Sequence, residues 1–364
     1  MQHRLCFFQK PAIHSLFVLL SIAGFTMNRK YFISSFITSG LVFSSLKGWT
    51  APVESNIKIP KYLQPGDTIG ITSPAGYISA EEIRPAVALM ENWGFKVQIG
   101  AAIGKKDYTF GGTDEERRAD LQQMIDNPDI AAIMCARGGY GLVRIIDQLN
   151  FEKIARHPKW IIGFSDITVL HCHMNRKYGL ATLHSKMCNS FPSDWTKAEP
   201  IQISTILSIR QALTGEETRY TAAAVISNRK GRAEGELVGG NLSIVASLSG
   251  TVSDLATKGK ILFLEDTGEY LYSLDRMFWN LKRTGKLSHL AGLIIGSFKV
   301  KPDDPDEIFG KSVYDIIMEK VKEFDYPVCF DFPVGHQRNN FALKCGVRHV
   351  LTISMEGTTL DSLN

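Results

Sequence analysis

Acidic residues are missing from the start of the chain. Residues 1–51 contain five Lys or Arg and no Asp or Glu. The rest of the chain carries 36 basic and 37 acidic residues, so the formal net charge of +4 belongs to this first segment. A basic excess confined to one end does not make the basic face that a nucleic-acid-binding domain presents. We therefore expect no nucleic-acid partner.

Unbroken apolar runs of the roughly 18–20 residues that a membrane span needs are also missing from residues 1–51. The basic residues 27–30 precede an apolar stretch, 31–46, and small residues follow at 48–51. This order is typical of an export signal. We expect residues 1–51 to be a leader, with Met27 as the true start. The protein would then be exported to the periplasm and meet the membrane only transiently; a leader kept as an anchor is the alternative.

Closely spaced cysteines and phosphate-binding motifs are absent. None of the six cysteines forms a C-x-x-C pair, which argues against a disulfide framework and a zinc site. No G-x-x-x-x-G-K-[ST] occurs, which excludes a standard nucleotide-hydrolase loop. We expect neither a metal nor a cofactor.

Strand and helix signals alternate through the first half of the chain. Capping boxes begin at Ser79 and Thr113, and each predicts the start of a helix. Continuous apolar strands are expected at residues 67–73, 95–99, 130–136 and 160–164. Such strands, alternating with helices, indicate an α/β fold whose parallel sheet is covered on both faces. Ligands bind such sheets beyond the carboxyl ends of the strands.

A change in composition divides the chain into domains. Residues 189–232 are polar and rich in Ser and Thr, and we interpret them as an inter-domain connection with one helix near 201–214. This assigns 60–188 to an N-terminal α/β domain and 233–364 to a smaller, mixed α/β domain. The expected elements of the second domain are a turn at 239–241, strands at 236–238, 260–264, 291–298, 328–332 and 347–353, and helices near 273–284 and 313–324.

Three polar residues follow apolar strands. Ser165, Glu265 and His336 are the residue types of a charge relay, in which the histidine takes the serine proton and the acid orients the histidine. Each residue also has a structural interpretation: a helix cap, a salt-bridge partner and a loop histidine, respectively. Asp266 and Glu269 compete with Glu265 for the role of the acid.

A glycine-rich loop, residues 136–141 (ARGGYG), follows the third apolar strand. Its backbone N–H groups could bind an anion, and Arg137 could pair with a substrate carboxylate. The alternative is a tight turn that needs glycine for its positive φ angles.

Five motifs together resemble the LD-carboxypeptidase family of serine peptidases, which includes muramoyltetrapeptide carboxypeptidases and microcin C self-immunity proteins. The resemblance extends from about residue 63 to 354. It implies a Rossmann-like N-terminal domain, a swivelling C-terminal domain, an active site between them, a homodimer and no metal. The motifs are ARGGYG at 136–141, GFSDIT at 163–168, GELVGGNL at 235–242, LFLED at 262–266 and FPVGH at 332–336.

The resemblance also implies roles for particular residues. Ser165 would be the nucleophile, Glu265 rather than Asp266 the acid, and His336 the base. The glycine loop would lie beside the nucleophile, so that the oxyanion and the substrate carboxylate would be bound by Gly138, Gly139, Asp166 and Arg137. One departure is visible: the family often has His-Gly-Pro-Met where residues 184–187 read His-Ser-Lys-Met.

The implied activity is removal of the terminal D-alanine from murein tetrapeptides, by Ser-His-Glu acyl transfer, in peptidoglycan turnover or recycling. The third residue of the substrate, diaminopimelate or lysine, stays open. One alternative is hydrolysis of a peptidyl-nucleotide amide, with Trp195 or Tyr270 stacking on the base; the leader argues against it because such a target is cytosolic. Another is a muropeptide-binding protein without turnover.

Overall fold

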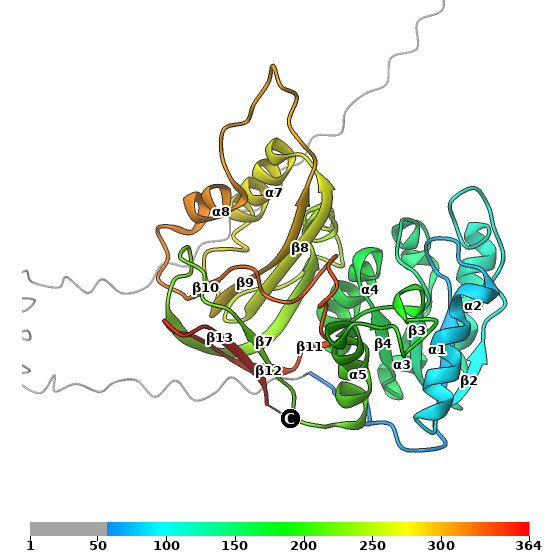
Figure 1. Ribbon diagram of the computed structural model, residues 1–364. Helices are drawn as coiled ribbons and strands as arrows, with labels where there is room; N and C mark the ends of the chain where they lie inside the picture. The colour runs from blue at the N-terminus through cyan, green and yellow to red at the C-terminus, as the bar shows by residue number, and fades with distance from the viewer. Residues whose placement is uncertain (1–56, 364) are drawn as a thin grey trace, which may run out of the picture. The chain divides into compact units, whose positions relative to one another are not determined.

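The structure is a computed structural model, and it describes residues 57–363. Its strands form two sheets, which we call the sheets of the first and second lobes (Figure 1). The first has the order β11-β5-β4-β3-β1-β2, and only β11 is antiparallel to its neighbour. Its strands are β1 (Thr68–Thr72), β2 (Lys96–Ile99), β3 (Ile130–Cys135), β4 (Trp160–Gly163), β5 (Thr182–His184) and β11 (Leu343–Cys345).

Helices cover both faces of the first sheet. The longer ones are α1 (Ala80–Asn92), α2 (Asp114–Asp126) and α5 (Pro200–Thr214), and the shorter ones are α3 (Glu152–Arg156) and α4 (Thr168–His173). The expected capping boxes at Ser79 and Thr113 are both formed. Short 3₁₀ helices are η1 (Leu142–Arg144), η2 (Ile146–Gln148), η3 (Ser165–Ile167) and η5 (Cys188–Ser190), and η4 (Met174–Tyr178) is a π-helix.

The apolar strands β3 and β4 lie between two hydrophobic clusters. Met134 and Ile162 pack with α1 and α5 on one face of the sheet. Ile133 and Ile161, which alternate with them, pack with α2, α3 and α4 on the other. Because successive side chains point to opposite faces, a strand buried on both sides must be apolar throughout, as the sequence indicated.

The second sheet is mixed, with the order β10-β9-β8-β7-β12-β13-β6. Strands β7 to β10 are parallel, and β12, β13 and β6 are antiparallel. Figure 1 shows α7 and α8 beside β8 and β9. The strands are β6 (Arg219–Ala222), β7 (Gly231–Asn241), β8 (Ile261–Glu269), β9 (Gly292–Val300), β10 (Val328–Cys329), β12 (Arg348–Ile353) and β13 (Thr358–Ser362), and the helices are α6 (Leu242–Ser247), α7 (Leu271–Arg283) and α8 (Val313–Val321).

The two sheets confirm the α/β architecture, but several elements differ from the sequence analysis. Residues 239–241 are the end of β7 and not a turn. Within 189–232, α5 packs into the first lobe's core, whereas β6 pairs with β13 of the second sheet. Strand β11, from the range assigned to the second domain, pairs with β5 in the first sheet. The exact domain bounds stay a prediction.

The segment predicted to be a leader, residues 1–51, lies outside the described residues. Within residues 57–363, no helix combines the length and the hydropathy of a membrane span. The five cysteines in this part of the chain are buried and free.

Candidate active site

Ser165 lies at a sharp turn where β4 ends and η3 begins. Its φ angle is +63°, a left-handed conformation that is unfavourable for residues other than glycine. Its side-chain oxygen lies 3.2 Å from Nε2 of His336. The turn therefore directs the hydroxyl toward a residue 171 positions further along the chain, and the serine is not simply a helix cap.

His336 joins Ser165 to Glu265. Its Nδ1 lies 2.6 Å from Oε2 of Glu265, whose side chain is fully buried in β8. A carboxylate can only accept a hydrogen bond, so Nδ1 donates and Nε2 of the neutral ring is left to accept the serine proton. The aromatic ring of Phe164 packs 4.9 Å from the His336 ring, between centroids. These contacts give the histidine the tautomer and the orientation that a general base for Ser165 requires.

The structure distinguishes the three candidate acids. Glu265 bonds to His336, whereas Asp266 accepts hydrogen bonds from Asn241 Nδ2 and from the backbone N–H groups of Ser243 and Thr267. Burial raises the pKa of Asp266 to about 6. Glu269 lies at the end of β8, where its backbone carbonyl accepts from Lys301. Glu265 is therefore the acid that contacts His336, whereas Asp266 is occupied by other donors.

The glycine loop lies against the nucleophile. A Cβ atom built on Gly138 would come within 2.9 Å of the Ser165 Cβ, and Gly139 has a φ angle of +99°. Among the described residues, the backbone N–H groups of Gly139 and Asp166 have no acceptor. These two donors are thus available beside Ser165, as an oxyanion hole requires.

The Asp166 carboxylate ties the serine turn to the glycine loop. Its Oδ2 accepts from the backbone N–H of Leu142 at 2.9 Å. Burial raises the pKa of this carboxyl to about 6. Asp166 therefore contributes in two ways: its side chain holds the loop, and its backbone N–H stays free.

Arg117 fixes the same loop from the other side. This fully buried guanidinium donates to the carbonyls of Pro74 at 2.6 Å and Gly141 at 3.0 Å, and it pairs with Asp114. The sequence analysis missed Arg117, because it stands in a charged helix start (DEERR) that is typical of an exposed surface.

Arg137 makes its contacts with residues of the first lobe. Its guanidinium donates to the carbonyl of Tyr77 at 3.1 Å and lies 3.9 Å from Glu82. Its side chain is about half-exposed, 45%, and makes no hydrogen bond with a triad residue in the described chain. Its role in binding a substrate carboxylate stays a prediction.

The second lobe contacts the serine turn through the end of β7. Thr168 Oγ1 accepts from the backbone N–H of Asn241 at 3.0 Å. A Cβ atom on Gly240 would lie 2.5 Å from the same Thr168 oxygen, so only glycine permits this approach. The motif read as a turn, residues 239–241, is therefore a strand end that positions the two lobes.

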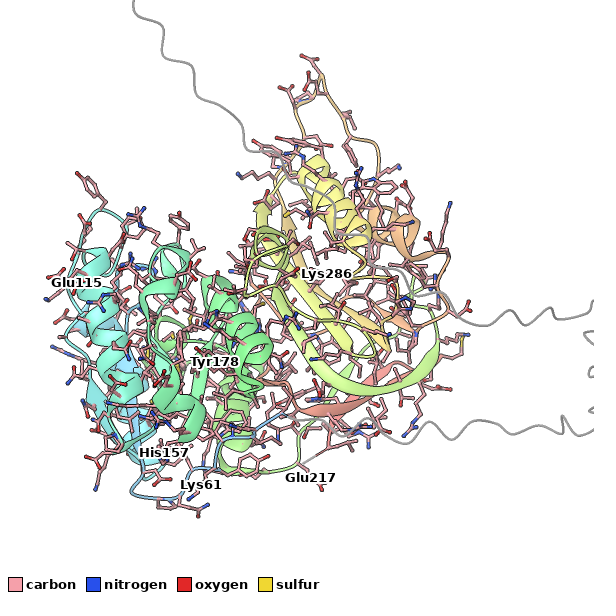
Figure 2. All side chains as sticks on the ribbon, turned by 180° about the vertical axis from the view of Figure 1, so that it is seen from behind. Lys61, Glu115, His157, Tyr178, Glu217 and Lys286 are labelled. Carbon is pink, nitrogen blue, oxygen red and sulfur yellow. The ribbon has the colours of Figure 1, made fainter. Side chains whose placement is uncertain are left out.

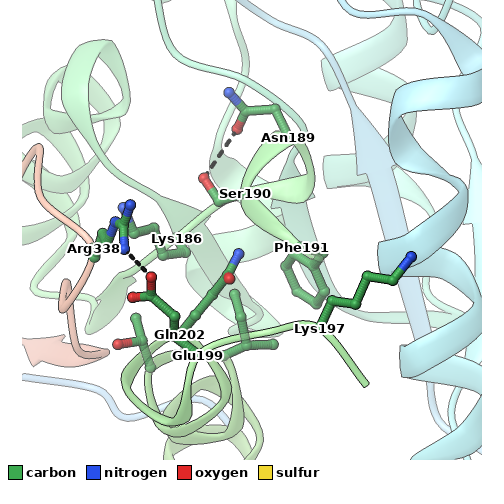
Figure 3. A pocket seen from close by; sticks show the side chains of 10 residues that line it. Lys186, Asn189, Ser190, Phe191, Lys197, Glu199, Gln202 and Arg338 are labelled. Carbon is green, nitrogen blue, oxygen red and sulfur yellow. Dashed lines mark hydrogen bonds and ion pairs between the residues drawn. The ribbon is translucent and has the colours of Figure 1, made fainter. Parts of the chain in front are cut away.

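A pocket of about 430 Å³ is lined by Lys186 and by Arg338, which follows His336 by two residues. Figure 3 shows Lys186, Phe191, Gln202 and Arg338 around it, with Arg338 paired to Glu199. A larger cavity, about 650 Å³, includes Lys61 and His157, which Figure 2 labels. His157 precedes β4 and Ser165 follows it. The larger cavity therefore lies at the amino ends of the strands, and the serine lies at their carboxyl ends. In residues 57–363, no three His, Cys, Asp or Glu side chains are grouped as metal ligands.

Two α/β lobes that bring a serine, a histidine and a glutamate together have the arrangement of a serine hydrolase. The chain belongs to the LD-carboxypeptidase family: that family's N-terminal domain matches residues 69–185 and its C-terminal domain matches 234–351. It is thus a carboxypeptidase of a serine peptidase family, as the motifs indicated.

Known proteins resemble the chain over most of its length. A "probable murein peptide carboxypeptidase" of Bacillus subtilis is 32% identical, over 83% of this chain and 94% of the relative. The microcin C7 self-immunity protein MccF of Escherichia coli is 26% identical, over 81% and 93%. The crystal structure of a muramoyltetrapeptide carboxypeptidase from Oxalobacter formigenes superposes with a TM-score of 0.72 at 28% identity, covering 82% of this chain and 99% of that one.

Proposed function

We propose that this carboxypeptidase removes the terminal D-alanine from murein tetrapeptides, with Ser165 as nucleophile, His336 as general base and Glu265 as its orienting acid. The observation that carries the proposal is the hydrogen-bonded series from Ser165 Oγ through His336 to Glu265 Oε2. The names of the relatives support the substrate class.

In the proposed reaction, Ser165 Oγ attacks the carbonyl carbon of the third residue while His336 Nε2 takes the hydroxyl proton. The backbone N–H groups of Gly139 and Asp166 stabilise the oxyanion, with Gly138 leaving room beside the serine. His336 then gives its proton to the departing amine of D-alanine, and an acyl-enzyme remains. Water, deprotonated by His336, releases the tripeptide and regenerates Ser165.

We further propose that the protein is exported and works where peptidoglycan fragments occur, as a homodimer. The basic and apolar pattern of residues 27–51 supports export. Cell fractionation tests the location: protein retained in the cytoplasm with residues 1–51 intact would contradict it. Light scattering of the purified protein tests the dimer, which a monomer mass would overturn.

The activity is tested by mass spectrometry of a disaccharide tetrapeptide incubated with the protein and with Ser165→Ala. We expect the parent to release one alanine and the variant to release none. Release by both would remove Ser165 from the mechanism. If neither released alanine but both retained the muropeptide, the protein would be a binding protein instead.

The alternative, cleavage of a peptidyl-nucleotide amide, is favoured by the likeness to the microcin C7 immunity protein. The two aromatic residues considered for stacking on a base have other partners. Trp195 packs against the first lobe's core, and the Tyr270 ring stacks on Tyr272 with centroids 5.6 Å apart. Incubation with an aminoacyl sulfamoyl adenosine would separate the two activities, and we expect no cleavage.

A further inference from the structure

Lys186 is a partly buried ammonium that forms no direct ion pair in the described chain, although the charge of Glu265 favours it and that of Lys299 disfavours it. In the described chain no carboxylate lies within ion-pair distance of it, and its one hydrogen bond goes to the backbone carbonyl of Gln337, at 2.5 Å. An ammonium has three N–H donors, so two of them have no acceptor. Buried charges in proteins are normally paired, and an unpaired one beside a pocket is suited to an anionic ligand.

The position of Lys186 joins the triad to the pocket. Its Nζ lies 5.6 Å from the centroid of the Phe164 ring, and that ring packs against His336. The carbonyl to which it donates belongs to Gln337, the residue after the catalytic histidine. Its side chain also lines the pocket of about 430 Å³ (Figure 3). Lys186 therefore contacts both the pocket and the residues that adjoin Ser165 and His336 in the sequence.

The other cations of this pocket are already neutralised. Arg338 pairs with Glu199, and Lys197 lies 3.3 Å from Asp194. Lys186 is therefore the cation of the pocket that remains open to a ligand among the residues described.

We propose that the pocket at Lys186 binds the side chain of the third residue of the murein peptide and selects diaminopimelate over lysine. This inference rests on the proposed function. The third residue carries the carbonyl that Ser165 attacks, so its side chain must leave the triad into adjoining space. Diaminopimelate ends in a carboxylate as well as an amine, and that carboxylate can accept the free donors of Lys186. Lysine ends in an ammonium alone, which Lys186 would repel.

The test measures kcat and KM on two tetrapeptides that differ only in the third residue, diaminopimelate or lysine. We expect the protein to prefer the diaminopimelate peptide by tenfold or more in kcat/KM. Lys186→Gln keeps a donor for the Gln337 carbonyl but removes the charge, so the preference should fall to within about twofold, mainly through KM. Lys186→Arg keeps the charge and should retain most of the preference.

Lys159→Gln is the matched control. Lys159 is also a buried lysine, and it donates to the backbone carbonyls of Met124 and Asn127. It precedes β4, whereas Ser165 follows β4, so it lies at the opposite end of that strand from the serine. Its replacement should leave the ratio of the two kcat/KM values unchanged. Thermal unfolding of each variant shows which ones are folded, and the lysine substitutions that fold are compared.

The outcomes separate this inference from the proposed function. Hydrolysis of neither peptide by the parent protein would overturn the proposed function and this inference with it. Equal hydrolysis of both, or a preference for lysine, would overturn only the inference. An equal loss on both peptides in Lys186→Gln would overturn it too, because Lys186 would then bind the terminal carboxylate that both peptides share.

Discussion

Gly335 lies directly against the Glu265 side chain. A Cβ atom at position 335 would be 2.6 Å from the Glu265 Cβ and 2.8 Å from its Oε2, and the backbone φ angle there is +108°. The residue before His336 thus needs to be glycine on two counts, backbone conformation and space. Its backbone N–H donates to Asn340 Oδ1 at 2.9 Å, which holds the turn that carries His336.

Gly335→Ala should reduce activity more than its backbone strain alone explains. The new methyl group must displace the side chain of Glu265 or of Ser297, so we expect kcat to fall by at least about tenfold and stability by about 1–3 kcal/mol. Gly250→Ala is the control, since Gly250 has a φ angle of +80° but nothing within 4 Å of its Cβ position. Urea unfolding and kcat are measured for both. Equal effects on kcat would contradict a role for the 335–265 contact.

Glu265→Gln and Asp266→Asn should have opposite signatures. An amide at 265 no longer fixes the histidine as a base, so kcat should fall by about 10²- to 10⁴-fold. Asp266 instead holds Asn241 and Ser243, and its substitution should mainly lower stability, with kcat within about tenfold of the parent. Steady-state kinetics and thermal unfolding of the two variants decide. A larger loss of kcat in Asp266→Asn than in Glu265→Gln would assign the role of the acid to Asp266 instead.

Protonation of His171 should destabilise the fold at acid pH. Its ring bonds to the Gly163 carbonyl at 2.9 Å and the Thr182 hydroxyl at 2.8 Å, and burial lowers its pKa to about 4. Since the unfolded chain binds this proton more readily, stability rises with pH between about 4 and 6.5 and is lost as pH falls through that window. His171→Gln should remove up to about 3 kcal/mol of this pH dependence. Unfolding curves of the variant as steep in pH as those of the parent would refute the assignment.

Arg117→Met should loosen the glycine loop. Removing a buried guanidinium leaves the carbonyls of Pro74 and Gly141 without their donor, and we expect a loss of about 3–5 kcal/mol. The neighbouring Arg118, which pairs with Glu115 near the surface, is the control, and Arg118→Met should cost much less stability than Arg117→Met. Denaturant unfolding measures both. Similar values for the two would show that the loop does not depend on Arg117.

The preference for diaminopimelate should fade at alkaline pH. Burial lowers the pKa of Lys186 to about 8, below that of an exposed lysine. As pH rises through about 8 the ammonium loses its charge, so KM for the diaminopimelate peptide should rise while KM for the lysine peptide changes less. If the ratio of the two KM values stayed constant from pH 7 to 9, the charge of Lys186 would not be the cause of the preference.

The parts of the fold that the sequence predicted are those set by local chemistry. The capping boxes at Ser79 and Thr113 and the apolar strands β3 and β4 depend on neighbours in the chain, and they lie where expected. The short strands β6 and β11 were missed because their pairing partners are far away in sequence. No pattern within a few residues specifies such a pairing.

The candidate site shows the same division. Ser165, Glu265 and His336 were proposed from their places near strand ends and from the family motifs, and the structure brings them together. Of the supporting residues, Arg117 was not predicted, and Lys186 was noted only as a departure from the family motif. Arg117 and Lys186 are charged residues whose burial depends on the packing of distant segments. Sequence alone cannot distinguish them from surface charges.

Strand β11 has a consequence for how the chain can be divided. It leaves the second lobe after His336, pairs with β5, and returns to β12. A fragment that stops at residue 232 would therefore expose the full edge of β5 to solvent. An exposed strand edge can pair with strands of other chains. The last strand of the first sheet follows His336 in the sequence, so neither lobe is complete until almost the whole chain has been synthesised.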